Sequence, residues 1–156
     1  MSATGRVTNL LVRRARPAYK WGWRAHRWVF ERTGGRRFTT VAGAQVCRLT
    51  VDGRRSGKAR SVLVIYVRRG EDLVVCASHA GHPRTPDWYR NLVASGRATV
   101  MVDGVTWPVR ARTPEGAERQ ACWALMTEAF PLDDEYQSMT DRRFPLAVLE
   151  PAGAAG

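Results

Sequence analysis

The residues best able to do chemistry lie in a short basic stretch between two apolar runs. Residues 53–60 are Gly-Arg-Arg-Ser-Gly-Lys-Ala-Arg, so half of the eight are cationic and two are glycines. The flanking runs, 46–51 and 62–67, are rich in the β-branched residues typical of strands. The stretch is therefore predicted to be a tight hairpin turn. Such a turn directs guanidinium, ammonium, hydroxyl and backbone N–H groups at one anion, here the phosphate end of a cofactor. The alternative is a solvated turn without a ligand.

Two later motifs suggest partners for this turn. Residues 77–81, Ala-Ser-His-Ala-Gly, end the third predicted strand with small residues, which let backbone N–H groups approach a flat ligand or a phosphate. Residues 86–91, Pro-Asp-Trp-Tyr-Arg-Asn, open a predicted helix whose free N–H groups favour an anion. Taken alone, Trp88 is more simply a core residue. Together, the three motifs are predicted to converge on one cofactor at the rim of a barrel.

Hydrolase and metal chemistry find little support. No local motif provides a Ser-His-Asp or Cys-His arrangement, and HExxH, CxxC and P-loop patterns are absent from the sequence. His79 and His82 are close in sequence, but nothing nearby completes a metal site, and His26 is expected to face solvent. The three cysteines lack metal-ligand spacing and are predicted to be reduced thiols in or near the core: Cys47, Cys76 and Cys122.

Most of the charge lies in the first 40 residues. They hold ten Lys and Arg residues and one acid, Glu31, out of a net charge of +11 for 156 residues, so the remainder is nearly neutral. No apolar run reaches the roughly 20 residues of a membrane span, and no signal peptide is recognisable, so a cytoplasmic protein is expected.

A basic, Trp-rich helix is predicted from residue 9 to about 32. One stripe is cationic (Arg13, Arg16, Lys20, Arg24, Arg27), and a second beside it is apolar (Trp21, Ala25, Trp28, Val29). Such a helix suits an anionic membrane surface through residues 9–32. It also suits packing against the domain or, as the least favoured partner, a nucleic acid. Residues 33–40 are predicted to be a linker.

The remaining chain is predicted to be mainly β with flanking helices (α+β). Six strands are expected, over residues 45–51, 61–68, 73–78, 98–102, 105–112 and 144–150. One helix spans 87–95, capped by Thr85 and stopped by Gly96. A second spans about 114–130, with Thr113 as its cap and a buried stripe formed by Cys122, Leu125, Met126 and Ala129. Six largely antiparallel strands with few helices favour a closed or partly closed small barrel.

Four motifs, in order, resemble the deazaflavin-dependent nitroreductase family, whose members are quinone and nitro reductases that use reduced coenzyme F420. They are residues 53–60, 77–81, 86–92 and 136–142, the last being Tyr-Gln-Ser-Met-Thr-Asp-Arg. The resemblance implies a split β-barrel of about six antiparallel strands, similar to the flavin-binding pyridoxamine oxidase-like fold. It also implies that the deazaflavin is a dissociable cosubstrate with an anionic phosphate and glutamate tail. The organisation is then a helix and linker (1–40), a barrel domain (41–151) and a tail (152–156).

The resemblance also assigns site residues. The phosphate and tail would be held by Arg54, Arg55, Ser56, Lys58 and Arg60. The cofactor would lie along Ser61, Val62, Leu63, Val64 and Ile65. The deazaflavin would contact Cys76, Ala77, Ser78 and His79, and the site would be closed by Asp87, Trp88, Tyr89, Arg90 and Asn91. Ser78 and Tyr136 would carry the chemistry, Ser78 by stabilising developing charge and Tyr136 by shaping the substrate pocket and donating a proton.

The function implied is hydride transfer from reduced F420 to a quinone, nitro or enone acceptor. Ala59 and Leu63 stand where the family usually has proline, and Ile65 replaces a frequent aromatic, so the acceptor is left open. Two alternatives remain, an FMN-binding split-barrel oxidoreductase and a non-enzymatic basic module that binds a membrane or nucleic acid. Family members often carry a membrane-associating N-terminal helix, which favours a peripheral location at the inner face of the cell membrane. The oligomeric state is not predicted.

Overall fold

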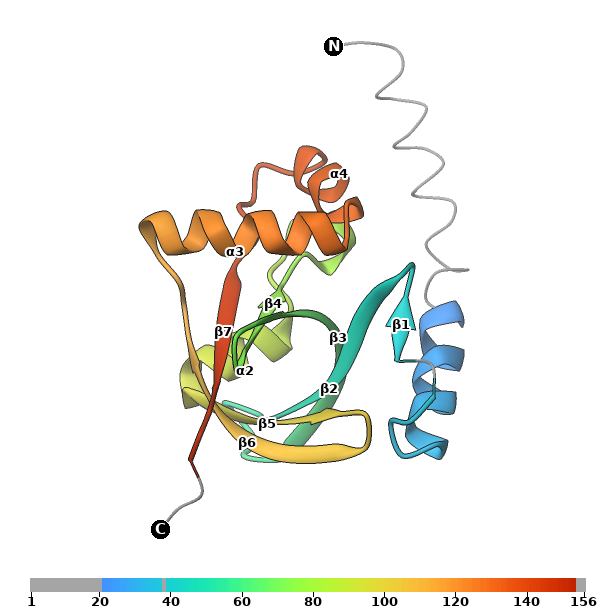
Figure 1. Cartoon of the computed structure of the whole chain (residues 1–156). Helices are drawn as coiled ribbons and strands as arrows, with labels where there is room; N and C mark the ends of the chain where they lie inside the picture. Colours follow the sequence, from blue (N-terminus) through green and yellow to red (C-terminus); the bar gives the residue numbers. More distant parts are fainter. Residues whose placement is uncertain (1–20, 38, 154–156) are drawn as a thin grey trace.

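Six antiparallel strands close into a barrel in the part of the chain that the structure describes. This computed structural model describes residues 21–37 and 39–153. The strands are β2 (Ala44–Asp52), β3 (Ala59–Arg69), β4 (Asp72–Cys76), β5 (Arg97–Val102), β6 (Val105–Arg112) and β7 (Leu146–Pro151). They are arranged in the order β2-β3-β4-β7-β6-β5, and β5 pairs back with β2 to close the ring (Figure 1). The predicted mainly β barrel of six antiparallel strands is therefore confirmed.

Alternation along the strands fills the barrel with apolar side chains. In β2, Cys47, Leu49 and Val51 are buried and recur at every second residue, which places them on one face of the strand. They join a core cluster with inward-facing residues of the other strands, among them Val64, Val75, Val100, Val109 and Leu149. The three cysteines are free thiols in or near the core, as predicted.

Helix α2 (Asp87–Ser95) packs on β2 and β5 and buries Tyr89 and Leu92 in the barrel core. Its predicted end is confirmed, because Gly96 takes the left-handed conformation, with φ of 66°, and its N–H bonds to the Leu92 carbonyl. The predicted Thr85 cap is wrong. Pro86 holds the N-cap position in an extended conformation, and no side chain caps the helix.

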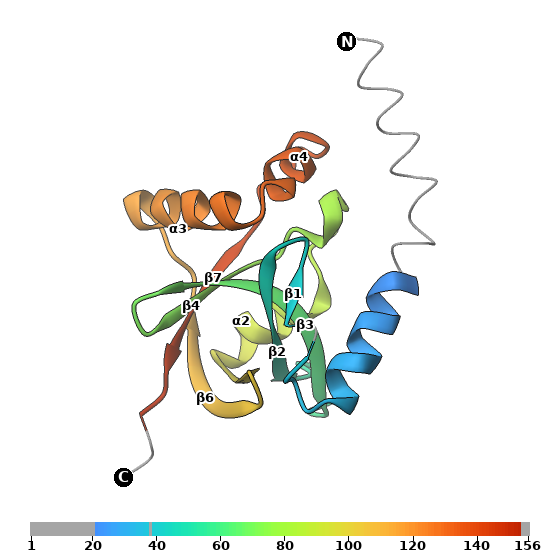
Figure 2. The ribbon, with the colours of Figure 1, turned by 45° about the vertical axis from the view of Figure 1, so that its right-hand side comes forward.

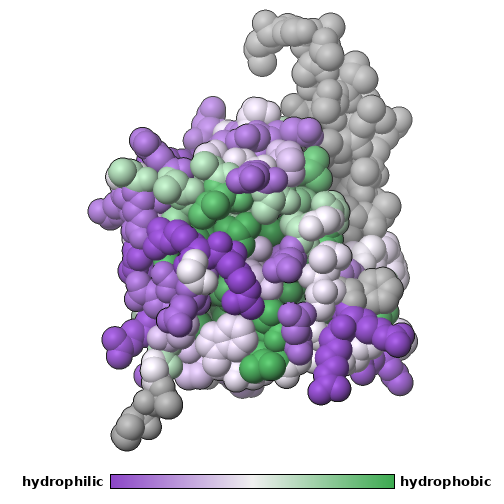
Figure 3. Space-filling model, viewed as in Figure 1, coloured by the Kyte–Doolittle hydropathy of each residue, from purple (hydrophilic) through white to green (hydrophobic). Residues whose placement is uncertain are grey.

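Helix α3 (Gly116–Ala129) lies across the outside of β3, β4 and β7. Only Cys122 and Met126 are buried, because this i, i+4 pair faces the apolar cluster on the barrel wall, whereas Leu125 is half-buried and Ala129 exposed. The predicted four-residue stripe was thus too wide. The N-cap is Glu115 rather than Thr113. In Figure 3, hydrophobic surface is visible below α3, whereas the cluster itself is fully buried.

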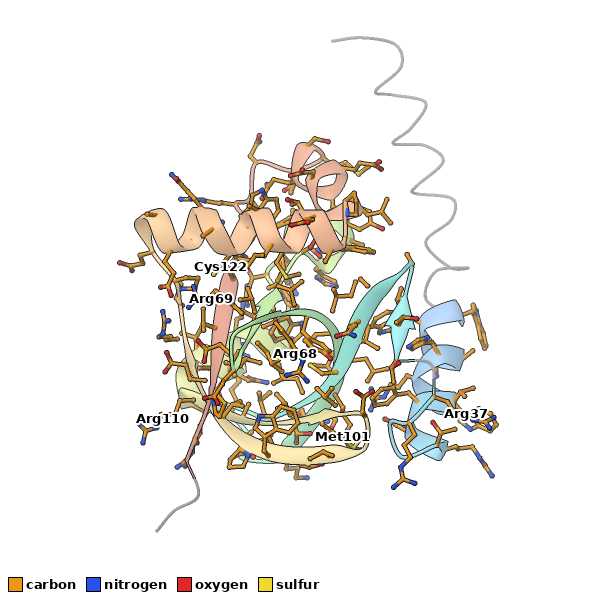
Figure 4. All side chains as sticks on the ribbon, viewed as in Figure 1. Arg37, Arg68, Arg69, Met101, Arg110 and Cys122 are labelled. Atoms are coloured by element: carbon orange, nitrogen blue, oxygen red, sulfur yellow. The ribbon has the colours of Figure 1, made fainter. Side chains whose placement is uncertain are left out.

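Ion pairs hold the first turn of α3 to the barrel. Glu118 accepts hydrogen bonds from Arg69 at 2.6 Å and from Arg112 at 2.7 and 2.8 Å. Hydrogen bonding to Arg112 and then Arg69 lowers the pKa of Glu118 to about 2. Arg69 also lies 3.4 Å from the Cys122 sulfur, and the two side chains meet under α3 (Figure 4).

A helix over residues 21–32 packs on the barrel beside β1 (Thr40–Val41), a short strand that pairs with β2 and begins at the last residue of the predicted linker (Figure 2). Its contact face differs from the predicted stripe. Phe30 is fully buried against Val46, Leu63 and Met101, and Trp23 packs beside them. The predicted apolar stripe instead leaves Trp21 72% and Trp28 59% exposed.

His26, which was expected to face solvent, is half-buried and stacks on Trp23, with ring centroids 5.7 Å apart. The part of the predicted helix from residue 9 to residue 20 lies outside the described residues. Among the helices that are described, none is long and apolar enough to cross a membrane.

Candidate functional site

The basic turn opens onto a cleft of about 420 Å³ between the β2–β3 hairpin and the start of α2. We call this the basic cleft. Its lining consists of Gly53, Arg54, Arg55, Ser56, Arg60, Ser61, Val62, Asp87, Trp88 and Asn91. Apart from Gly53, every one of these residues was predicted to bind the cofactor. The fold therefore brings two of the sequence motifs together across a gap of about 30 positions in the chain.

Arg54 is held in place by α2. Its backbone N–H and its guanidinium both donate to Asn91 Oδ1, at 3.2 and 2.9 Å, and the guanidinium pairs with Asp87 at 3.2 Å. Asn91 is only 7% exposed, so its amide is a rigid anchor. By contrast, the side chains of Arg55 and Arg60 make no hydrogen bond or ion pair within the described residues. These two guanidinium groups are available to an anion.

The turn itself is built by short backbone bonds. Gly53 N–H donates to the Lys58 carbonyl at 2.9 Å, and Gly57 N–H donates to the Gly53 carbonyl at 2.7 Å. A Cβ added at Gly53 would lie 2.7 Å from Ser56 Oγ, so a larger residue would displace the serine that lines the cleft. Lys58 is exposed and does not line the cleft, although it was predicted to act with the arginines.

A second group of predicted residues lies where β4 ends. We call residues 77–82 the Ser78 loop. His79, Ala80 and Gly81 follow one another with φ of 51°, 49° and 72°, and this left-handed backbone is costly for the two residues that have a Cβ. Gly81 is needed for a second reason, because an added Cβ would lie 3.1 Å from the Tyr136 carbonyl oxygen.

Arg142 holds this strained loop. Its guanidinium donates to three backbone carbonyls, those of Ala77, Ser78 and His82, at 3.1, 2.8 and 3.1 Å. It also stacks over Phe144, with its central carbon 4.7 Å from the ring centroid. A planar fork with several donors can satisfy three acceptors at once, which a lysine cannot do in the same geometry. The last motif, 136–142, thus supports the loop as well as supplying Tyr136.

Tyr136 comes from α4 (Leu132–Ser138), a short helix absent from the sequence prediction that packs beside η1 (His79–Gly81). Burial, then the nearby acids Asp133 and Glu135, raise the pKa of the Tyr136 phenol. The phenol is therefore a protonated donor at neutral pH. Because α4 packs against η1, Tyr136 lies on the same side of the barrel as the Ser78 loop.

Asp133 is a site residue that sequence reasoning missed. It is 2% exposed, and burial raises the pKa of its carboxyl to about 6, while hydrogen bonding with the Ser78 and Cys76 side chains moderates the rise. The only sequence signal was its position three residues before Tyr136, which places both on one side of a helical turn.

Several other predicted cofactor residues contribute through the fold rather than by lining the basic cleft. Val64, Ala77 and Tyr89 are buried in the barrel core, and the Tyr89 hydroxyl donates to the Leu146 carbonyl at 3.0 Å. Leu63 is buried beneath the helix over 21–32. The cleft lining also leaves out Ile65 and Cys76, which lie toward the Ser78 loop, His79, which is part of that loop, and Arg90, which is exposed.

Strand β3 connects the two groups. Its first residues, including Arg60, lie at the basic cleft, and its register with β4 pairs Tyr66 with Val75, so Ile65 lies next to the strand end that leads into the Ser78 loop. Five residues of strand span roughly 17 Å. The stretch of β3 from Arg60 to Ile65 thus has cationic groups at its first end and leads, at its other end, toward the hydroxyl groups of Ser78 and Tyr136.

Comparisons with known proteins agree with this geometry. The sequence model of the F420H(2)-dependent quinone reductase family matches residues 21–151. An F420H(2)-dependent quinone reductase of Mycobacterium tuberculosis (strain ATCC 25618 / H37Rv) is 29% identical over 130 residues, or 81% of this chain and 87% of that protein. The structure of an F420-H2 dependent reductase (FDR-A) is 36% identical with a TM-score of 0.63, covering 67% of this chain and 93% of that one. Another structure, of a domain-swapped dimer, is 34% identical with a TM-score of 0.66, covering 79% and 97%.

The fold and the comparisons define a barrel reductase that uses a deazaflavin. The chain belongs to the F420H(2)-dependent quinone reductase family, and reduced coenzyme F420 is its hydride donor. The residues present fit that group. Three guanidinium groups and one carboxylate line the basic cleft, which suits a phosphate and a glutamate tail, and the absence of a Cβ at Gly53 lets Ser56 keep its place in the lining.

Proposed function

We propose that the protein reduces a quinone, with the anionic tail of F420 in the basic cleft and the substrate beside the Ser78 loop. The observation that carries this proposal is the layout along β3, with unpaired cations at one end and hydroxyl donors at the other. Arg55 and Arg60 bind the tail, and Asn91 keeps Arg54 in place at the edge of the cleft. Nitro and enone compounds are further acceptors of the same chemical type.

Reduced F420 supplies a hydride when it is bound. The chain then has to stabilise the negative charge that develops on the acceptor oxygen and deliver a proton to it. Ser78 and Tyr136 provide hydroxyl donors for this purpose, held by the Arg142 contacts and by α4. Positioning donor and acceptor side by side supplies much of the remaining rate.

The test is a spectrophotometric assay of reduced F420 oxidation with a menaquinone-type quinone, a nitroaromatic and an enone as acceptors. We expect turnover with the quinone and slower turnover with the other two. The same chain without acceptor is the control for oxidation by oxygen. No oxidation with any acceptor, despite F420 binding, would overturn the proposal. A yellow protein that retains FMN through purification would instead support the FMN-binding alternative.

We also propose that the helix over residues 21–32 attaches the protein to an anionic membrane surface, so that it is a cytoplasmic enzyme bound peripherally at the inner face of the cell membrane. Trp21 and Trp28 project from the barrel, with the guanidinium of Arg24 over the first ring at 5.7 Å and that of Arg32 over the second at 4.9 Å. Exposed tryptophans interleaved with arginines suit an anionic interface. In this proposal residues 1–40 serve the membrane, 41–151 form the catalytic domain and 152–156 are a tail.

Vesicle flotation tests this attachment. We expect the protein to float with vesicles rich in anionic lipid but not with zwitterionic ones, and we expect Trp21→Ala with Trp28→Ala to reduce flotation at least tenfold. Val93→Ala is the matched control, because Val93 is an exposed apolar residue on α2. Equal flotation of the double variant and the control would show that the two tryptophans do not mediate binding. Release of the protein from vesicles by competing nucleic acid would indicate that the helix binds nucleic acid.

A further inference from the structure

The inference concerns Asp133, the second residue of α4. The first turn of α4 carries three acids, of which Asp134 and Glu135 are exposed while Asp133 is buried. Its Oδ1 atom is buried and has no hydrogen-bond partner in the part of the chain that the structure describes. An ionised carboxylate left unpaired in such a place is costly, whereas a protonated carboxyl is tolerated.

The surroundings of the carboxyl favour a bound proton. Burial is the main influence on the pKa and raises it, and the like charge of Asp134 acts in the same direction; the nearby side chains of Ser78 and Cys76 lower the pKa but only in part offset the effect of burial. Tyr136 also faces it from the same helix. Arg119 on α3 and Arg142 act on the neighbouring Cys76, but neither forms an ion pair with Asp133 within the described residues. Among the described residues, no cation therefore holds the carboxylate in its charged form.

The neighbours of Asp133 connect it to the proposed reaction. Ser78 lies on the loop that Arg142 clamps, and this loop is where the proposed substrate binds. Ser78 has a single hydroxyl proton, so it can donate to a substrate oxygen only if another group replaces that proton. Asp133 is a buried acid in contact with Ser78, and its free Oδ1 atom gives it room for a proton.

We propose that Asp133 stores the proton that Ser78 passes to the reduced quinone. This inference rests on the proposed function. Transfer of a hydride adds two electrons and one proton to the quinone, leaving a hydroquinone anion. The Ser78 O–H bond breaks as a new O–H bond forms on that anion, and the Asp133 O–H bond breaks as the serine hydroxyl is restored. Asp133 is left as a carboxylate and takes a proton from water before the next turnover. The quinone is reduced, and the deazaflavin is oxidised.

The first experiment needs no activity. Infrared spectra of the protein, recorded across a pH series, should contain a protonated-carboxyl stretching band that disappears as pH rises through about 6. The band should be absent from Asp133→Asn and retained in Asp134→Asn, which removes an exposed neighbouring carboxyl and should move the titration only slightly, to lower pH, because the like charge of Asp134 is lost. Absence of a band titrating in this range in the wild-type protein would overturn the proposal, even if Asp133→Asn failed to fold.

The second experiment compares pH profiles for quinone reduction. In the wild-type protein kcat should fall about tenfold per pH unit above the Asp133 pKa, because the proton is then missing. At pH 6, Asp133→Asn should lower kcat about 100-fold, lose this pH dependence, and leave KM and F420 binding nearly unchanged. If Asp133→Asn keeps the wild-type profile, Asp133 has only a structural role. If neither the wild-type protein nor any variant oxidises reduced F420, the proposed function fails. That failure is distinct from failure of the Asp133 proposal, which the infrared spectra test without any activity.

Discussion

Replacing Arg55 and Arg60 together with alanine is expected to weaken F420 binding about 100-fold or more. Both guanidinium groups line the basic cleft, and neither has a partner within the described chain, so the substitutions remove ligand contacts without breaking internal ones. Each hydrogen bond to a charged group contributes about 1.5 kcal/mol at the lower end of its range, and the pair about 3 kcal/mol. Each 1.4 kcal/mol is a tenfold change in affinity, which gives the expected loss.

Fluorescence titration of F420 measures this loss, and Arg110→Ala is the matched control. Arg110 is an exposed arginine on β6 that points away from the barrel (Figure 4), so its removal changes the net charge without changing the cleft. The difference from the control should shrink at high salt, because the contacts are partly exposed to solvent. A loss of less than threefold would contradict the assignment of the cleft to the tail.

The same titration ranks the other basic residues of the turn. Lys58→Ala should have a smaller effect than Arg60→Ala, because Lys58 lies outside the cleft lining. Arg54→Ala is a less specific test, since Arg54 also bonds to Asn91 and Asp87 and its loss frees the start of α2. From the sequence alone, all the cations of the turn were equivalent. Only the fold shows which ones face the cleft.

The barrel strands were predictable because their signals are local and repeated. Alternating apolar residues in β2, together with the Asp-Gly turn between β5 and β6, fix strand and hairpin before any tertiary contact is known. The end of α2 was equally clear, because glycine is the residue that tolerates the left-handed cap at Gly96. The helix starts were not, since Thr85 and Thr113 both had the chemistry of a cap but neither caps its helix.

Tertiary contacts decided the face of the N-terminal helix. Trp21, Ala25, Trp28 and Val29 form one apolar stripe, and Trp23, His26 and Phe30 form another at similar spacing. Periodicity cannot choose between two such stripes. The second one is inside because Phe30 meets a pocket made by Val46, Leu63 and Met101, three residues from strands far along the chain. Prediction from sequence would have required knowledge of that pocket.

Asp133 could not have been found from sequence for a related reason. It lies in a run of three acids, and such a run is normally solvated. The three acids lie in the first turn of α4, a helix that has no apolar periodicity and is only seven residues long. Which of three adjacent acids is buried depends on the angle at which that helix meets the Ser78 loop. The buried acid is therefore a property of the tertiary structure.

Replacing Asp133 with asparagine is expected to change the free energy of unfolding more favourably at neutral pH than at pH 4. In the folded protein the pKa of Asp133 is raised from its ordinary 3.8 to about 6, mainly by burial. As pH rises through this window, the unfolded chain loses the proton first and so binds fewer protons than the folded chain. The free energy of unfolding of the wild-type protein then falls as pH rises. A shift of two pKa units corresponds to about 3 kcal/mol, and the amide has no such ionisation.

Urea unfolding of Asp133→Asn and of the wild-type protein at pH 4 and pH 7.5 measures the effect. Any hydrogen bond that the amide loses contributes equally at both pH values, so the change in the difference between them reports the ionisation alone. Asp134→Asn, at an exposed acid on the same helix, should show almost no change. A pH-independent difference for Asp133→Asn would mean that the pKa of Asp133 is the same in the folded and unfolded states. Asp133 would then hold no proton at neutral pH, and the proposal would fail. If Asp133→Asn is instead more stable than the wild-type protein at neutral pH and reduces quinone poorly, Asp133 is an acid that serves the reaction and lowers the stability of the fold.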